Sequence, residues 1–198
     1  MKKLLIIAAL LLPAFGHAQE VLGRSIIDGR SITILADGTW EYVEAEDARC
    51  DVIYRGVEFC GGAGGWQRTT PPNSEISASY RFDDRHYGQM IIEALGEDDG
   101  LTSKAMRQII IQNAAAATGV QPSDIAVIDV HPSVFAGRTI ETIVYTFDVE
   151  GLNVVFANAI STSPRQTMQL MTYAIGPEYT DQHRSLHEAF LSEIKLQN

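Results

Sequence analysis

The sequence predicts an α+β protein, in which helices cover an antiparallel sheet and a small β-meander comes first. Residues 103–118 carry apolar side chains at helical spacing, and four segments after them alternate in polarity as strands do. A second helical pattern closes the chain at 179–195. The order strand, strand, helix, four strands, helix is typical of an α+β sandwich.

The first predicted helix has clear ends. Thr102 can cap its start, while Gly119 and Pro122 close it. One face repeats at helical spacing and is expected to be buried against the sheet. This face comprises Met106, Ile109, Ile110, Asn113 and Ala117.

The predicted strands are 76–82 and 88–95 before the helix, and 125–130, 139–149, 152–160 and 166–175 after it. A two-residue turn at Glu150-Gly151 sets a register in which Phe147 opposes Val154 and Tyr145 opposes Phe156. One face of this hairpin is therefore large and apolar. The other is small and mixed, as expected under a second layer. The closing helix presents Tyr179, Leu186, Phe190 and Ile194 toward the sheet.

Residues 21–43 read as a meander, because Asp28-Gly29 and Asp37-Gly38 are hairpin dipeptides. The string 31–43, with its Asp-Gly-Thr-Trp turn, resembles a short module near the start of many exported bacterial proteins. That resemblance implies a hairpin and no chemistry. Trp40 is expected to pack, and an exposed Trp40 could instead contact a partner.

The C-terminal part resembles the PsbP-type α/β/α sandwich. The resemblance rests on the strand pair before a long helix, the turn Phe135-Ala-Gly-Arg138, and the ending Phe190-Leu-Ser-Glu-Ile194. It implies an accessory, assembly or ligand-binding role, because members of this fold are mostly not enzymes.

The first 18 residues predict a secretory signal peptide with cleavage before Gln19. Lys2 and Lys3 precede an apolar run at 4–12, and small residues stand at Gly16 and Ala18. The run is too short for a spanning helix, which needs roughly 20 residues. No Cys follows the cleavage site to take a lipid, so the expected location is periplasmic or secreted.

The mature chain is strongly acidic. Removing Lys2 and Lys3 from the 15 basic residues leaves 13 against 25 acidic ones, a formal charge of about −12. Nucleic-acid binding gains its affinity from Lys and Arg that displace counterions, so nucleic acid is excluded as a partner class. Solubility is the simplest explanation of the acidity.

The two cysteines, Cys50 and Cys60, predict a disulfide across a hairpin in an oxidising compartment. A three-residue loop with Gly56 in left-handed backbone would pair Ile53 with Val57 and bring the cysteines opposite each other. A redox-active thiol pair is the weaker alternative, because such pairs favour two intervening residues at a helix start.

The Gly-rich segment 61–65 lacks the Lys-Ser or Lys-Thr of a phosphate-binding loop. Residues 61–74 are therefore expected to form an irregular connector that Trp66 attaches to the body. The predicted organisation is a signal peptide at 1–18, the meander at 19–49, the disulfide hairpin and connector at 50–75, and the sandwich domain at 76–198.

His183 and His187 are the candidate metal ligands, since a spacing of four places both rings on one helical face. The competing interpretation is structural, because they fall in the stripe of Leu186 and Phe190. Residues 83–86 resemble an acid–base group and 97–100 part of a calcium loop, but a solvated turn and a helix entry explain them better.

These observations favour a non-enzymatic binding or accessory protein of the bacterial cell envelope, without a cofactor. Its partner is an unidentified protein or small ligand, and Trp40 and Trp66 are the candidate contact residues together with the hairpin and connector. The alternative is a metal-binding protein or metal-dependent enzyme that uses His183 and His187. A secreted effector or inhibitor is a third possibility.

Overall fold

The computed structural model describes residues 20–27, 30–42, 50–149 and 151–197. The predicted signal peptide at 1–18 and the dipeptide Asp28-Gly29 lie outside these ranges. Within the described ranges, none of the helices has the length and apolar character needed to cross a membrane.

A seven-stranded sheet forms the centre of the molecule, in the order β6-β7-β8-β12-β11-β10-β9, with every neighbouring pair antiparallel. This confirms the predicted antiparallel sheet. Its strands are β6 (Gln67–Thr69), β7 (Ala78–Arg81), β8 (His86–Glu93), β9 (Ala126–Phe135), β10 (Arg138–Val149), β11 (Leu152–Ser163) and β12 (Gln166–Ile175). Short 3-10 turns, η1 (Glu97–Asp99) and η2 (Pro122–Asp124), flank the first helix in sequence.

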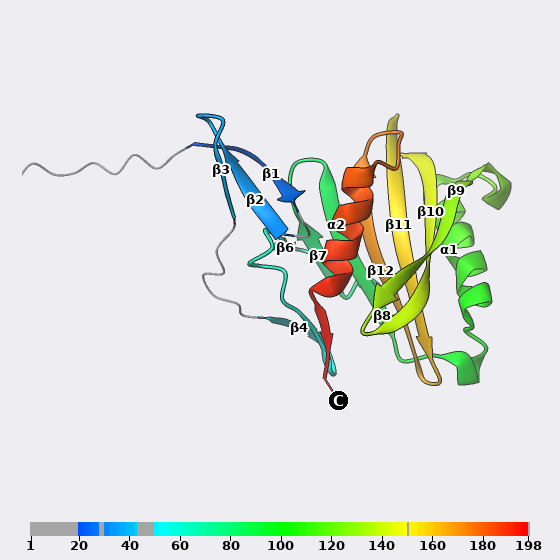
Figure 1. Cartoon of the computed structure of the whole chain (residues 1–198). Helices are drawn as coiled ribbons and strands as arrows, with labels where there is room; N and C mark the ends of the chain where they lie inside the picture. Colours follow the sequence, from blue (N-terminus) through cyan, green and yellow to red (C-terminus); the bar gives the residue numbers. More distant parts are fainter. Residues whose placement is uncertain (1–19, 28–29, 43–49, 150, 198) are drawn as a thin grey trace, which may run out of the picture.

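Two helices cover opposite faces of this sheet: α1 (Ser103–Thr118) and α2 (Asp181–Ser192), as Figure 1 shows. The predicted caps of α1 are present, because Thr102 Oγ1 accepts from the Ala105 N–H at 3.3 Å and Gly119 is left-handed with φ 71°. The closing helix ends at Ser192, short of the predicted 195.

The predicted buried face of α1 is partly wrong. Asn113 and Ala117 are exposed, whereas Ala114 and Ala115 are buried with Met106 and Ile110. The physical reason is the run of four alanines at 114–117, which presents the same small side chain in every direction. Such a run does not specify which side of the helix faces the sheet.

The register of the β10–β11 hairpin is confirmed. Tyr145 pairs with Phe156 and Phe147 with Val154. The rings of Tyr145, Phe147 and Phe156 stack beneath α1 with centroids 5.0 to 6.1 Å apart. The opposite face, which carries small side chains such as Thr142 and Ala157, is buried on the α2 side.

A second sheet contains the disulfide hairpin, in the order β13-β5-β4. It comprises β4 (Asp51–Tyr54), β5 (Val57–Phe59) and β13 (Ile194–Leu196). Cys50 and Cys60 are disulfide-bonded, with Cα atoms 4.1 Å apart, as the sequence predicted.

The predicted three-residue hairpin loop is wrong. Tyr54, not Ile53, pairs with Val57, so the turn is Arg55-Gly56 and the register shifts between Val52 and Tyr54. Gly56 has φ 72°, which permits the tighter turn, and a bulge takes up the additional residue.

Three other elements differ from expectation. β6 lies in the segment predicted to be an irregular connector, β13 lies where the closing helix was expected to continue, and β9 extends to Phe135. β6 and most of β13 are exposed edge strands of three residues, so backbone pairing rather than an apolar pattern forms them. Through β6 and β13 the segments 50–75 and 76–198 share both sheets.

A third sheet precedes these two: β1 (Val21–Ile27), β2 (Arg30–Leu35) and β3 (Trp40–Tyr42), in that order. This is the predicted meander. Arg24 Nη1 donates a hydrogen bond to the Gly65 carbonyl at 2.8 Å, which connects the meander to the Gly-rich segment.

Candidate functional site

The two candidate histidines lie side by side in the interface between α2 and the sheet. His183 is 1% exposed and His187 is 0% exposed. His183 Nε2 lies 3.1 Å from Thr172 Oγ1 on β12, and His187 Nδ1 lies 3.0 Å from the same oxygen. Both rings are thus on one face of the helix, as their spacing predicted, and they share one hydroxyl.

The polar contacts continue across the sheet. His187 Nε2 lies 3.5 Å from Thr142 Oγ1 on β10, and Thr142 Oγ1 lies 2.6 Å from Ser133 Oγ on β9. Thr142, Ser133 and Thr172 are all buried. We call these five residues, His183, Thr172, His187, Thr142 and Ser133, the buried polar chain.

Two further histidines flank the buried polar chain, each with a carboxylate. His86 Nδ1 lies 2.9 Å from both oxygens of Asp83, and the His86 and His183 ring centroids are 6.2 Å apart. At the other side, His131 Nδ1 lies 3.0 Å from Asp129 Oδ2 and its ring stacks on Tyr179.

The carboxylates in these pairs are held ionised. Burial alone would raise the pKa of Asp83, but hydrogen bonds from the His86 side chain and the Arg85 backbone outweigh it and lower that pKa. The hydrogen bond from Arg184 is the main cause that lowers the pKa of Asp129, with a smaller contribution from His131. Residues 83–86 therefore form a hydrogen-bonded turn, as expected from sequence.

Burial lowers the pKa of both helical histidines. The pKa of His183 falls to about 4, mainly through desolvation and then through His86, while a hydrogen bond with the Thr172 backbone acts in the opposite direction. The pKa of His187 falls to about 3, through desolvation and then through His183 and His131. Both rings are neutral at neutral pH.

The arrangement bears on the two interpretations of the histidine pair. Both rings are buried, as the structural interpretation expects, and their side-chain partners are threonine hydroxyls rather than carboxylates. Across residues 20–27, 30–42, 50–149 and 151–197, no cluster of three or more His, Cys, Asp or Glu side chains is arranged to hold a metal ion. Metal binding by His183 and His187 stays a prediction.

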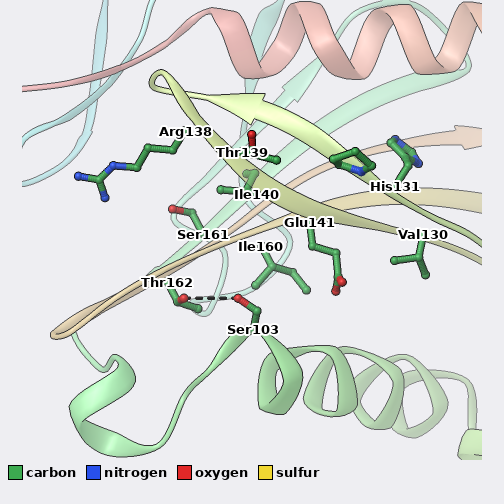
Figure 2. Close-up of a pocket in the computed structure, with 11 residues that line it drawn as sticks. Ser103, Val130, His131, Arg138, Thr139, Ile140, Glu141, Ile160, Ser161 and Thr162 are labelled. Carbon is green, nitrogen blue, oxygen red and sulfur yellow. Dashed lines mark hydrogen bonds between the residues drawn. The ribbon is translucent and has the colours of Figure 1, made fainter.

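A groove opens on the α1 side of the sheet, between the start of α1 and the β9–β10 hairpin (Figure 2). It has a volume of about 510 Å³. Figure 2 shows Glu141 and Ile160 directed from the sheet toward the helix, and Ser103 Oγ lies 3.5 Å from Thr162 Oγ1. Sequence reasoning missed this groove, because its lining comes from three segments far apart in the chain.

The carboxylate of this groove, Glu141, is paired with an arginine of α1. Arg107 Nε donates to Glu141 Oε1 at 2.9 Å, and its Nη2 contacts the second carboxylate oxygen. Thr162 Oγ1 donates to Glu97 at 2.7 Å. Besides this ion pair, the lining consists of hydroxyls, apolar side chains, His131 and the guanidinium of Arg138, which suits binding better than acid–base chemistry.

A second groove, of about 700 Å³, lies on the other side of β9, against the end of α2 and β13. Its lining includes Val134 of β9, Leu191 of α2 and Leu196 of β13. β9 is the last strand of the seven-stranded sheet, so its outer edge carries no paired strand among the described residues. Grooves therefore open on both sides of β9, an edge strand.

The edge strand β9 is unusually apolar for an exposed element. Its large apolar side chains exposed by more than 40% are Val127, Ile128, Val130 and Val134. Val134 is the most exposed, at 72%. Pro132, which has no N–H to donate, is the one sequence signal that β9 is an edge strand; the rest of the strand order is set by long-range pairing.

The two tryptophans behave differently. Trp66 is 4% exposed and packs against Phe59, Phe82 and Phe190, so the surface role suggested for it is corrected to a core role. Trp40 is 49% exposed, with its ring edge-on to Tyr42. It stays a candidate contact residue.

The comparisons with known proteins identify the fold. No family model matches the chain, and no curated protein matches it. The solution structure of cyanobacterial PsbP (CyanoP) from Synechocystis sp. PCC 6803 aligns with a TM-score of 0.50 at 14% identity, over 71% of this chain and 86% of that one. The chain has a PsbP-like α+β fold. At this identity the likeness concerns the fold alone.

Two other solved structures are more distant. A crystal structure from Bacteroides thetaiotaomicron VPI-5482 aligns at 8% identity with a TM-score of 0.47, over 77% of this chain and 50% of that one. LpqN of Mycobacterium tuberculosis, a protein involved in cell envelope biogenesis, aligns at 12% identity with a TM-score of 0.41, over 68% and 79% of the two chains. The resemblance of residues 31–43 to an export-associated module stays a prediction.

Proposed function

We propose that this chain is an exported, non-enzymatic binding or accessory protein of the bacterial cell envelope, and that it binds a partner protein along β9. Three features support export: the signal-like residues 1–18, the disulfide between Cys50 and Cys60, and the PsbP-like fold. The non-enzymatic part rests on the neutral, hydroxyl-bonded histidines and the paired carboxylates described above.

The exposed apolar edge of β9 is the observation that carries the proposal. A free strand edge presents unpaired backbone groups, and proteins usually protect such an edge with charged side chains. β9 contains Asp129 and Pro132, but it also exposes four large apolar side chains, Val127, Ile128, Val130 and Val134. Clustered exposed apolar side chains mark interaction sites on soluble proteins. The grooves on either side would accept side chains of the partner.

Site-specific photo-crosslinking in cells tests the binding surface. A crosslinking residue at Val134 is expected to trap a partner, whereas one at Val52 on β4 is not. Val52 is a matched control because it is another strand valine, 67% exposed, on a different sheet. Equal trapping at both positions would refute binding along β9.

A pair of charge substitutions provides the second arm. Val130→Asp with Val134→Asp should abolish the crosslink formed from Ile128, while Val52→Asp should leave it unchanged. Because all three valines are exposed, each variant should keep the thermal stability of the parent. A crosslink from Ile128 that survives the double substitution would show that Val130 and Val134 do not carry the binding, which would refute the proposed role of this apolar edge.

Cell fractionation tests the export part separately. The mature chain should begin at Gln19, appear in the periplasm or medium, and contain no free thiol. Full-length protein in the cytosol with both thiols reduced would refute export without bearing on β9.

A further inference from the structure

A third groove lies at the opposite end of the central sheet from β9. It has a volume of about 530 Å³ and opens between the start of β1 and the turn that joins β7 to β8. Gln67 of β6 also lines it, and β6 is the terminal strand of the seven-stranded sheet at this end. Figure 1 shows the meander at the same end of the sheet. The groove is therefore separate from the two that flank β9.

Three arginines from separate segments line this groove, which we call the arginine groove. They are Arg24 of β1, Arg81 of β7 and Arg85 of the turn between β7 and β8. Their presence together runs against the overall charge of the chain, which is −10. A guanidinium presents five N–H donors in a planar fork that matches the oxygens of a carboxylate or a phosphate. The residue types thus favour an oxyanion as the ligand.

Backbone carbonyls hold two of the three guanidinium groups in place. Arg24 Nη1 donates to the Gly65 carbonyl at 2.8 Å. Arg85 Nε and Nη2 donate to the Ile175 carbonyl at 3.2 and 2.8 Å, and the Ile175 N–H donates to the Arg85 carbonyl at 3.0 Å. These bonds use one of the five donors of Arg24 and two of those of Arg85, which leaves the others for a ligand.

Two aspartates also line the arginine groove, and both have partners. Asp83 accepts from the backbone N–H groups of Arg85 and His86 at 2.8 Å each, and it lies 2.9 Å from the His86 ring nitrogen. Asp83 thus orders the turn that carries Arg85. Asp84 lies 3.6 Å from Arg81 and its side chain is 96% exposed. Three arginines against two aspartates leave the groove with a net positive charge.

The wall that β1 contributes is apolar. Val21 and Leu22 line the groove beside Arg24, and they are 54% and 65% exposed. Ligand sites combine apolar surface with a few placed polar groups, in volumes of roughly 300–1,000 Å³. The arginine groove has both parts, with the charged groups next to the apolar ones. Such a surface matches a molecule that joins an anionic group to a hydrocarbon chain.

We propose that the arginine groove binds a small amphiphilic anion, in which Arg81 and Arg85 hold a carboxylate or phosphate group and Val21 and Leu22 contact a short hydrocarbon chain. An ion in the groove lies close to the arginines, whereas salt screens exposed charges farther away than about 10 Å. An anionic membrane would instead face the whole acidic surface, so a free small molecule suits the groove better than a bilayer. This site goes beyond the proposed function.

Isothermal titration calorimetry of the purified protein with octyl phosphate, below its micelle concentration, tests the site. Octyl phosphate should bind at least about tenfold more tightly than inorganic phosphate, because its chain buries apolar surface. Arg81→Gln with Arg85→Gln should weaken the binding of octyl phosphate by at least about tenfold, since charge-assisted hydrogen bonds are lost.

Arg55→Gln with Arg165→Gln is the matched control for charge. It removes two positive charges from exposed arginines outside the arginine groove, and it should change the affinity for octyl phosphate by less than about twofold. No binding to the wild-type protein, or equal losses of affinity in the two double variants, would overturn the proposal.

Leu22→Asn tests the apolar wall by itself. Because Leu22 is largely exposed, the variant should fold as the parent does. Its affinity for octyl phosphate should fall by about threefold or more, through the lost apolar contact. An unchanged affinity would overturn the proposed contact with the hydrocarbon chain.

Vesicles of phosphatidylglycerol distinguish a free ligand from a membrane surface. The protein should not sediment with them at 0.1 M salt, because its net charge is negative. Sedimentation that Arg81→Gln with Arg85→Gln abolishes would overturn the proposal, since the groove would then serve a bilayer.

Discussion

Gly88 of β8 lies directly against Phe190 of α2, so Gly88→Ala is a direct test of the packing between the sheet and the helix. A Cβ at this position would lie 2.5 Å from Phe190 Cε2 and 3.0 Å from its Cδ2 and Cζ. The Phe190 ring is 0% exposed and is surrounded by Phe59, Trp66 and Tyr80, so it cannot move aside. Overpacking of this kind costs about 1–3 kcal/mol. We expect Gly88→Ala to lower the free energy of unfolding by that amount.

A double-mutant cycle isolates the cause. Phe190→Leu removes the ring atoms that a Cβ at position 88 would meet, at a cost of about 1–2 kcal/mol for the lost buried surface. In that background Gly88→Ala should cost less than about 0.5 kcal/mol. Urea unfolding followed by circular dichroism at pH 7.5 measures all four proteins. Gly62→Ala is the control, since no atom lies within 4 Å of its Cβ. Additive costs in the cycle would refute the steric explanation.

Other predictions concern the disulfide, the histidines and a second glycine. Replacing Cys50 and Cys60 by Ala should lower the free energy of unfolding by about 3 kcal/mol, measured by urea titration, since the bond closes a short loop in the unfolded chain; an unchanged value would contradict this. Between pH 7.5 and pH 5, the free energy of unfolding measured by urea titration should fall by about 2 kcal/mol for each of His183 and His187, because the two rings bind protons in the unfolded chain but not in the folded one. A free energy of unfolding that does not change with pH would show that the rings are not neutral and buried. Zinc should leave the melting temperature unchanged if both rings stay bonded to Thr172, and a rise would instead support the metal hypothesis. Gly96→Ala should prevent folding, judged by circular dichroism, because its Cβ would lie 2.2 Å from the Ser163 backbone oxygen; a folded variant would be evidence against this close approach.

Short sequence patterns predicted the features that depend on residues close together in the chain. The turn at Gly151 set the β10–β11 register, Thr102 and Gly119 set the ends of α1, and two cysteines ten positions apart set the disulfide. Each depends on a few neighbouring residues. For that reason a single sequence was sufficient to predict these three features.

Contacts between distant segments were not predictable in this way. The spacing of His183 and His187 placed them on one helical face, but nothing marked Thr172 as their common partner. In the same way, β13 has no distinctive composition, and only its pairing with β5 makes it a strand. Both depend on which parts of the chain meet after folding.

The pairing of β13 with β5 has a consequence for when the protein can fold. β5 ends at Phe59 and its partner begins at Ile194, so the second sheet is incomplete until residues 194–196 are present. Contacts of such long separation form late and slowly. In a chain that emerges from its N-terminus, the β1–β3 meander and the seven-stranded sheet can therefore be completed first, whereas the β13-β5-β4 sheet cannot.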